Sequence, residues 1–177
     1  MGAGLRCLVA KRVLFYTFVP MNKTERKVWF AASLRNGQWK KCSRSLDEIG
    51  IGYFIPSSYN TLLFFNTVKS RALSLVNSGK INARFFIDHS THTLLEVPDK
   101  QMDDFIRVSQ DPDCVEYAPP GVLMKGDKVV VTRGPLAGVE GEIAEDDDGT
   151  PFLVVRVLSL LCAKTKISRE NVRLKDV

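Results

Sequence analysis

The sequence predicts an α+β protein in two parts, an N-terminal α/β sandwich followed by a small SH3-like all-β barrel. Segments typical of strands and helices alternate over residues 13–110. Three prolines and a glycine then occur in a polar run within residues 111–122, which indicates a linker. From 123 to 177 the pattern changes to short β-rich segments separated by turn residues. Residues 1–12 precede both parts as an N-terminal extension, and we expect the barrel to fold and tumble semi-independently.

Residues 13–110 contain the patterns of a sheet with helices packed on it. A capping-box pattern, Asn22 with Glu25 three residues later, predicts a helix that carries Val28, Ala31 and Leu34 on one face. A second helix is expected over 69–78, closed by Gly79, and a third starts at Pro98-Asp99 and buries Met102, Phe105 and Ile106. Strands are expected at 13–19, 50–56, 61–65, 81–87 and 93–97.

The predicted barrel consists of short strands and specific turns. The Gly134-Pro135 pair indicates one bend, and Asp148-Gly149 is typical of a tight hairpin. The acidic run of residues 146–148 is interpreted as a solvated hairpin tip rather than a cation site. The strands are expected at 128–132, 139–144, 152–158, 163–167 and 172–174.

Composition excludes several classes of protein. The chain has 177 residues, of which 45% are hydrophobic, and its apolar runs are too short to cross a bilayer. No secretory signal is evident at the N-terminus, so we expect a cytoplasmic protein. The four cysteines lie far apart in the sequence, which argues against a zinc ribbon or a disulfide framework. His89 and His92 have no third ligand nearby, so no metal is expected.

Catalytic motifs are also missing from the sequence. It has no glycine-rich phosphate loop, no Ser-His-Asp spacing and no helical zinc-protease motif. We therefore expect neither an enzyme nor a bound cofactor.

Positive charge is concentrated in one segment. Lys and Arg number 25 against 20 Asp and Glu, and the excess lies between residues 22 and 45. With Trp29 and Trp39 as stacking platforms, this segment is a candidate nucleic-acid surface. The alternative, which we favour, is a solvated helix whose tryptophans lie partly in the core. The candidate nucleic-acid-binding residues are Lys23, Arg26, Lys27, Arg35, Lys40, Lys41 and Arg44.

Residues 126–143 closely resemble the KOW motif of transcription and ribosomal proteins. The valines can fill a barrel, and the glycines suit bends and close strand approach. We expect most of the motif to build the fold and its loop residues Arg133 and Leu136 to be free to contact a partner. The motif residues are Gly126, Asp127, Val129, Val131, Arg133, Gly134, Pro135, Leu136, Gly138, Gly141 and Ile143.

The first part resembles the N-terminal (NGN) domain of the NusG family. The segment 15–27 is similar to its opening strand and first helix, and Tyr53-Phe54-Ile55-Pro56, residues 61–65 and residues 95–99 resemble further landmarks in the same order. With the linker and the KOW motif, the resemblance covers residues 13–177. Its details are most similar to the UpxY-like NusG paralogs, operon-specific antiterminators of surface-polysaccharide clusters.

This resemblance implies a monomeric regulator of transcription elongation and antitermination that binds the clamp of RNA polymerase. An apolar pocket on the sheet face would receive the clamp, and the matching positions here are Val19, Tyr59, Leu62 and Phe85. The barrel would contact a ribosome or a termination factor, and no membrane is involved.

The alternative is a ribosome-associated or RNA-binding KOW protein. It is disfavoured because the barrel carries nine basic and nine acidic residues after Met124 and is therefore a poor phosphate binder.

The loop over residues 56–61 is shorter than the hairpin that NusG relatives usually carry between the same strands. Because relatives place base-reading residues on that hairpin, we predict that nucleic-acid binding by this chain is weak and does not discriminate between sequences. Phosphate-dominated binding must fall steeply as salt rises. Fluorescence anisotropy with unrelated oligonucleotides at low and physiological salt measures both properties, and salt-resistant, sequence-selective binding would contradict the prediction.

Overall fold

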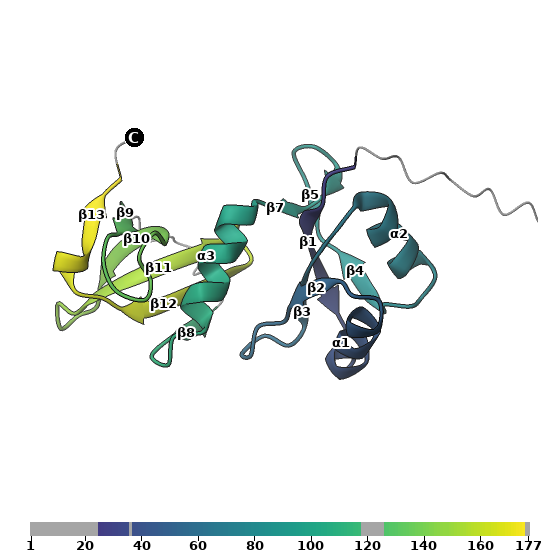
Figure 1. The fold of residues 1–177 in the computed structure, drawn as a ribbon, viewed down its shortest axis with the longest axis horizontal. Coiled ribbons are helices and arrows are strands. Elements are labelled where there is room, and N and C mark those ends of the chain that lie inside the picture. Colours follow the sequence, from purple (N-terminus) through teal and green to yellow (C-terminus); the bar gives the residue numbers. More distant parts are fainter. Residues whose placement is uncertain (1–24, 36, 118–125, 176–177) are drawn as a thin grey trace, which may run out of the picture.

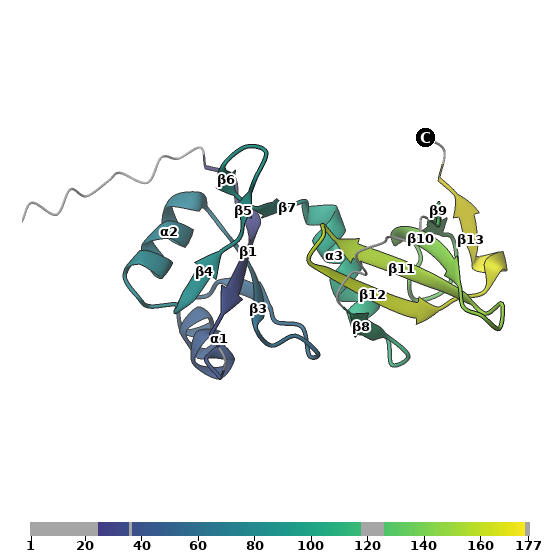
Figure 2. The ribbon, with the colours of Figure 1, turned by 180° about the vertical axis from the view of Figure 1, so that it is seen from behind.

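The computed structural model describes residues 25–35, 37–117 and 126–175, which form three sheets and three α-helices (Figures 1 and 2). The N-terminal sheet has the order β2-β3-β1-β4, and β7 also pairs with β1. Its strands are β1 (Val28–Leu34), β2 (Gly52–Phe54), β3 (Leu62–Thr67), β4 (Ala83–Phe85) and β7 (Glu96–Val97). Two further short strands, β5 (Ile87–Asp88) and β6 (Thr93–Leu94), pair with each other. The mixed α/β architecture expected from the sequence is confirmed.

The two faces of the N-terminal sheet are covered by different helices. Phe30, Ala32 and Leu34 of β1 lie in one buried cluster with residues of α1 (Trp39–Glu48) and α2 (Lys69–Asn77). Ala31 lies in another cluster with residues of α3 (Asp99–Ser109). This alternation is the period-two pattern of a central strand that is buried on both faces.

The C-terminal lobe, β8 to β13, is an antiparallel sheet of order β13-β9-β10-β11-β12-β8. Its core contains Val129, Val131, Leu153 and Val155, which are buried. The five strands expected for residues 123–177 are all present, with ends shifted by one or two residues. The elements are β8 (Val115–Tyr117), β9 (Asp127–Val131), β10 (Glu140–Glu145), β11 (Pro151–Val157), β12 (Leu161–Lys166), the 3₁₀ turn η1 (Arg169–Asn171) and β13 (Val172–Leu174).

The helix expected from Asn22 through Leu34 is wrong, because Val28–Leu34 forms the central strand β1. The triplet Val28, Ala31 and Leu34 fits helical spacing, but Phe30 and Ala32 between them are equally buried, which a one-sided helix does not allow. The first helix begins instead at Trp39. The strand expected at 13–19, and Val19 with it, lies outside the described residues.

The other helices agree with the sequence. Residues 69–77 form α2, and Gly79 has a φ of +72°, as a helix-terminating glycine requires. Helix α3 starts at Asp99 directly after Pro98 and buries Met102 and Phe105, while Ile106 is half-buried. Within the part of the chain that the structure describes, no helix is long and apolar enough to cross a bilayer.

The expectation that residues 111–122 only separate two parts is wrong in two respects. Residues 115–117 form β8, which pairs with β12. In addition, buried residues of α3 and of the C-terminal lobe belong to one continuous cluster that also includes Ala31 and Phe64 of the N-terminal sheet. Prolines at 112, 119 and 120 flank β8 without interrupting it, so the proline count did not reveal the strand.

The turn chemistry predicted around residue 135 is confirmed. Gly134 and Gly138 have φ angles of +83° and +85°, and Gly149 at the acidic hairpin has +75°. Gly141 of β10 serves close packing instead, since a Cβ atom there would lie 2.6 Å from the carbonyl oxygen of Val154. These backbone requirements explain the glycines without any contact to a partner.

We predict that Gly141→Ala lowers the free energy of unfolding by about 1–3 kcal/mol, because the new methyl group overlaps backbone that cannot move freely. Gly52→Ala is the matched control, since a Cβ atom there meets nothing within 4 Å. Urea unfolding of both variants measures the difference. Equal stability of the two variants would show that β10 and β11 are not so closely packed.

Candidate functional site

Two of the predicted polymerase-binding residues lie together at the face of the N-terminal sheet that is turned toward α3. Tyr59 and Leu62 are half-buried and pack against the same buried cluster as Ala31 and Phe64. A turn brings them close, because the N–H of Leu62 donates to the carbonyl oxygen of Tyr59 at 2.8 Å. Trp29 of β1 is also half-buried against this cluster and was not predicted as part of the face.

The other two predicted positions do not join them. Val19 lies outside the described residues. Phe85 packs on the opposite face of the sheet, with its ring centroid 6.2 Å from that of Phe30 and 6.0 Å from that of Phe65. The sequence places Phe85 on a strand correctly, but the face depends on the register of β4 against β1, in which Phe85 pairs with Ala32.

Helix α3 covers part of the face that carries Tyr59 and Leu62. The ring of Phe105 meets that of Phe54 edge-on, with centroids 5.9 Å apart. At the sheet's edge, Ser57 Oγ and the Ser58 N–H donate to the carboxylate of Glu116 at 3.3 and 3.1 Å. These hydrogen bonds link the β2–β3 loop to β8. With α3 covering part of the apolar face, Tyr59 and Leu62 remain half-exposed.

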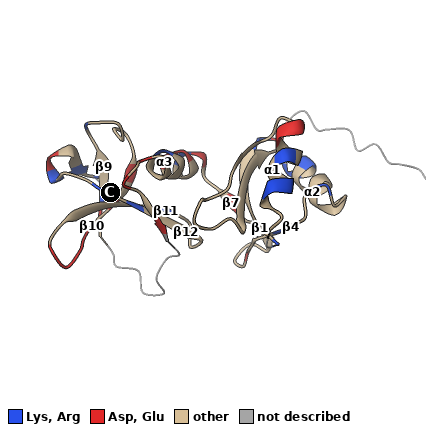
Figure 3. Cartoon of the chain, turned by 90° about the horizontal axis from the view of Figure 1, so that it is seen from below, with Lys and Arg blue, Asp and Glu red and all other residues tan. Residues whose placement is uncertain are grey.

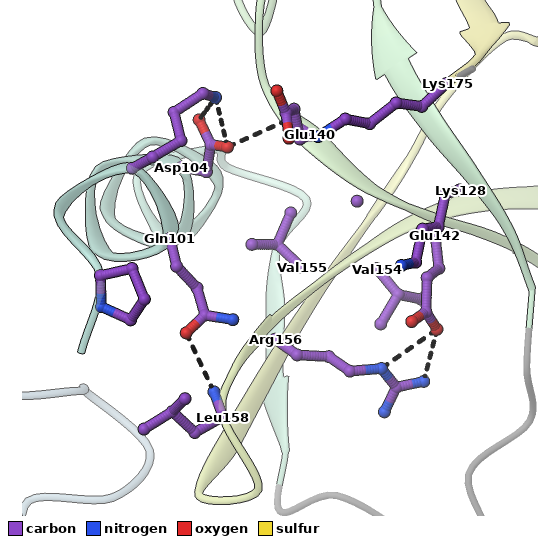
Figure 4. Close-up of a pocket in the computed structure, with 13 residues that line it drawn as sticks. Gln101, Asp104, Lys128, Glu140, Glu142, Val154, Val155, Arg156, Leu158 and Lys175 are labelled. Atoms are coloured by element: carbon purple, nitrogen blue, oxygen red, sulfur yellow. Dashed lines mark hydrogen bonds and ion pairs between the residues drawn. The ribbon is translucent and has the colours of Figure 1, made fainter. Parts of the chain in front are cut away.

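The opposite side of α3 forms a polar seam with the C-terminal lobe (Figure 4). Asp104 is only 3% exposed, and it accepts the N–H of Glu140 at 3.0 Å and a hydrogen bond from Lys100 at 2.6 Å. Gln101 Oε1 accepts the N–H of Leu158 at 3.3 Å. A buried carboxylate that is both paired and hydrogen-bonded is a specific link between two elements.

A cleft of about 380 Å³ lies beside this seam, between α3 and strands β10 and β11. Its charged groups are largely paired with one another, as Arg156 donates to Glu142 at 3.0 Å and Lys175 pairs with Glu140. The Lys175 ammonium lowers the pKa of Glu140. The paired charges indicate a structural seam rather than a binding site for an ion.

The loop of residues 132–138 is docked on α3 as well. Arg107 donates to the carbonyl oxygens of Pro135 and Ala137 at 2.9 and 3.0 Å, and Lys100 donates to that of Gly138 at 2.9 Å. The expectation that Leu136 is free to contact a partner is wrong, because its side chain is half-buried against the shared core. Arg133 is exposed, as expected.

The remaining residues of the KOW-like segment support the sheet. Val129 and Val131 are buried, Ile143 is half-buried, and Gly126 leaves room for the backbone of Ile143. Asp127 and Pro135 are exposed.

The structure divides the basic segment into two groups (Figure 3). Arg26 and Lys27 precede β1, and Arg26 lies 3.9 Å from Asp99. Arg35 follows the other end of β1, and Lys40, Lys41 and Arg44 are exposed on α1. Lys23 lies outside the described residues. The single basic helix expected from the sequence is therefore replaced by a cationic surface on α1 alone.

The tryptophans of the basic segment are separated in the same way. Trp29 lies on the α3 side of the sheet, whereas Trp39 is the first residue of α1. Trp39 lines a groove of about 480 Å³ together with Ser43, Tyr53, Phe54, Ile55, Pro56, Ser57 and Asn60. Trp39 beside Lys40 and Lys41 was predicted from the sequence as a stacking platform, but the groove itself was not predicted.

No group of three metal-binding side chains occurs within the described ranges of the chain. His89 and His92 are both exposed, at the turn between β5 and β6. Cys42 and Cys162 are buried, and Cys114 is half-buried. Burial, together with the carboxylates of Glu116 and Asp111, raises the pKa of Cys114 to about 11, so its thiol is protonated and unreactive near neutral pH.

Comparison with known proteins finds similarity to solved structures. No protein-family model matches the chain, and no curated protein matches it. Among solved structures, the chain is similar to NusG of Thermotoga maritima, in a structure that shows domain interaction in that protein. The sequence identity is 17% and the TM-score 0.47, over 85% of this chain and 98% of the other.

We predict that Asp104→Ala lowers the free energy of unfolding by about 1–3 kcal/mol, because it removes a buried carboxylate and leaves the Glu140 N–H without its acceptor. Asp103→Ala on the exposed side of the same helix is the control and should change stability by less than about 0.5 kcal/mol. Urea unfolding gives the energies. Hydrogen exchange at the Glu140 amide tests the contact directly, and an unchanged exchange rate in Asp104→Ala would disprove it.

Proposed function

We propose that this chain is a NusG-like regulator of transcription elongation that binds RNA polymerase and promotes antitermination. The sequence resemblance to UpxY-like paralogs supports an operon-specific role of the surface-polysaccharide type. The single structural observation that carries the proposal is the half-exposed apolar face at Tyr59 and Leu62, which the resemblance assigned to the polymerase clamp.

The chemistry of this face suits a protein partner. Trp29, Phe54 and Tyr59 contribute aromatic area, and interfaces commonly draw most of their binding energy from a few such residues. The turn that joins Tyr59 to Leu62 and the bonds from Ser57 and Ser58 to Glu116 hold the loop in place before binding. A loop that is already ordered loses less conformational entropy when a partner docks. Such a regulator acts by binding alone, with no covalent step.

The alternative function is a ribosome-associated or RNA-binding KOW protein. It would use the C-terminal lobe, where Arg133 is an exposed basic residue of the loop that docks on α3. That loop makes three hydrogen bonds to α3 through its own carbonyl oxygens, so its backbone is engaged within the chain. We therefore favour the polymerase proposal.

We predict that Tyr59→Ala combined with Leu62→Ala weakens binding to core RNA polymerase at least about 10-fold, since both side chains belong to the proposed contact. Lys69→Ala is the control, because Lys69 is exposed on α2 at the other face of the sheet. Binding is measured with immobilised core polymerase, and terminator read-through is measured in a transcription reaction with the same proteins.

Circular dichroism melting must first show that the double variant is folded. A folded double variant that binds polymerase as tightly as the parent would place the contact elsewhere. Retention of the parent chain by ribosomes but not by polymerase would favour the alternative function.

A further inference from the structure

The groove at Trp39 runs between α1 and a free edge of the N-terminal sheet. Strand β2 forms this edge, since within the described residues it pairs with β3 alone. Along an antiparallel edge strand, alternate residues direct their N–H and C=O groups away from the sheet. Natural edges are commonly blocked by a charged residue or a proline, but the three residues of β2 are Gly, Tyr and Phe. This edge can therefore pair with another extended chain.

The walls of the groove are aromatic and apolar. Trp39 and Ser43 lie on the α1 side, while Tyr53, Ile55 and Pro56 belong to β2 and the residues that follow it. Trp39, Tyr53 and Ile55 are half-buried, so the core supports them from beneath and they still present surface to the groove. Walls of this kind accommodate the alternate side chains of an extended peptide.

The two ends of the groove carry opposite charge. Lys40 Nζ lies 5.3 Å from the centroid of the Trp39 ring. Asp47 lies eight residues after Trp39, about 12 Å further along the helix axis, and it accepts a hydrogen bond from the Tyr53 hydroxyl at 3.2 Å. The groove is therefore positive near Trp39 and negative near Tyr53.

From this arrangement we propose that the groove binds an extended segment of a protein partner, which adds to β2 as a further strand. Its acidic side chains lie beside Lys40, and its apolar side chains pack against the walls. Strand addition beside an edge strand takes its affinity from main-chain hydrogen bonds and its specificity from side-chain pockets. At about 3.3 Å per residue, about four residues of the partner span the distance from Trp39 to Asp47.

A peptide suits the charge of the groove better than a nucleic-acid strand does. A nucleic acid carries a phosphate at every nucleotide, so it would also place negative charge beside Asp47 and beside Glu116, which is bonded to Ser57 at the loop. A peptide can carry its acidic side chains at the Lys40 end alone. The open main-chain groups of β2 also have no counterpart in a nucleic acid, whereas another extended polypeptide matches them.

The groove is separate from the proposed polymerase contact. Trp39 and Tyr53 pack with the α1 side of the sheet, whereas Tyr59 and Leu62 pack with the α3 side. Peptide binding and polymerase binding can therefore be lost independently of each other.

The first experiment separates a specific contact from simple charge attraction. The full chain is titrated with a labelled peptide, Glu-Glu-Val-Ile-Val blocked at both ends, and with the reversed sequence, because a strand can add in either direction. One of the two should bind about 10-fold tighter than a peptide of five glutamates and than the same peptide with lysines in place of its glutamates. Equal or tighter binding of the all-glutamate peptide would overturn the proposal.

Methylation of the peptide backbone tests strand pairing directly. In an added strand, alternate N–H groups point toward β2 and the others point away. An N-methyl group at one apolar residue should therefore weaken binding about 10-fold, while one at the next residue should leave it nearly unchanged. Equal affinity of the two methylated peptides would show that the peptide does not pair with β2.

Variants then locate the contact. Trp39→Ala and Lys40→Glu should each weaken peptide binding about 5- to 10-fold. Lys41→Glu is the matched control, because Lys41 is exposed about 200° around α1 from Trp39, and it should change the affinity by less than about 2-fold. Circular dichroism checks that the variants are folded. Equal losses in Lys40→Glu and Lys41→Glu would mean that only net charge matters, and the proposal would fail.

Competition and sedimentation test the other occupants. Oligothymidylate that displaces the peptide at a lower concentration than the unlabelled peptide itself would assign the groove to nucleic acid and overturn the proposal. Sedimentation velocity shows whether the chain associates with itself. A dimer that Trp39→Ala dissociates would assign the groove to a second copy instead, whereas a monomer that binds the peptide supports a separate protein partner.

Discussion

The position of helix α3 is the constraint on which the rest of the structure depends. Eleven residues long, it lies between the N-terminal sheet and the C-terminal lobe, and both cores meet on it. Phe105 contacts Phe54 of the sheet, while Met102 and Val108 belong to the cluster that includes the valines of the lobe. Helix α3 buries apolar side chains on two sides, and exposing them to water would be unfavourable. The two lobes are therefore held against each other.

Polar contacts give this apolar packing its register. The Asp104 carboxylate fixes α3 against β10 through the Glu140 N–H, and the Arg107 guanidinium fixes it against the loop of residues 132–138. Apolar surfaces can slide, but a buried carboxylate without its partners is strongly unfavourable, so these bonds select one arrangement. Gly134 and Gly138 of that loop have positive φ angles. These angles form the turn that the sequence predicted, and they also allow the loop to lie against α3.

Local signals in the sequence predicted most helices, strands and turns correctly. They failed where pairing between distant strands determines the secondary structure. Gly79 closing α2, Pro98 before α3 and the turn glycines of the C-terminal lobe are local, and the structure agrees with them. Residues 28–34 fit a helical stripe as well as a strand, and only pairing with β3 and β4 makes them the central strand. The side on which Phe85 lies follows from the same pairing.

The candidate sites were predictable to a similar extent. Tyr59 and Leu62 are close in sequence and lie on one face of the sheet, whereas Phe85 lies on the other. Asp104 was visible as a polar residue within the buried stripe of α3, but its partner Glu140 is 36 residues away. The groove at Trp39 required knowing that α1 begins there, whereas the sequence pattern predicted a helix that begins near residue 22. It also required the strand order, which places β2 at the edge of the sheet.

Strand β2 separates the apolar face at Tyr59 and Leu62 from the groove at Trp39, and its residues contribute to both. Its successive residues point to opposite faces, so Tyr53 packs with the α1 side and Phe54 with the α3 side. Beyond the strand, the loop continues this division, since Pro56 lines the groove and Tyr59 packs with the other face. A short strand with a short loop thus places the apolar face at Tyr59 and the groove at Trp39 back to back.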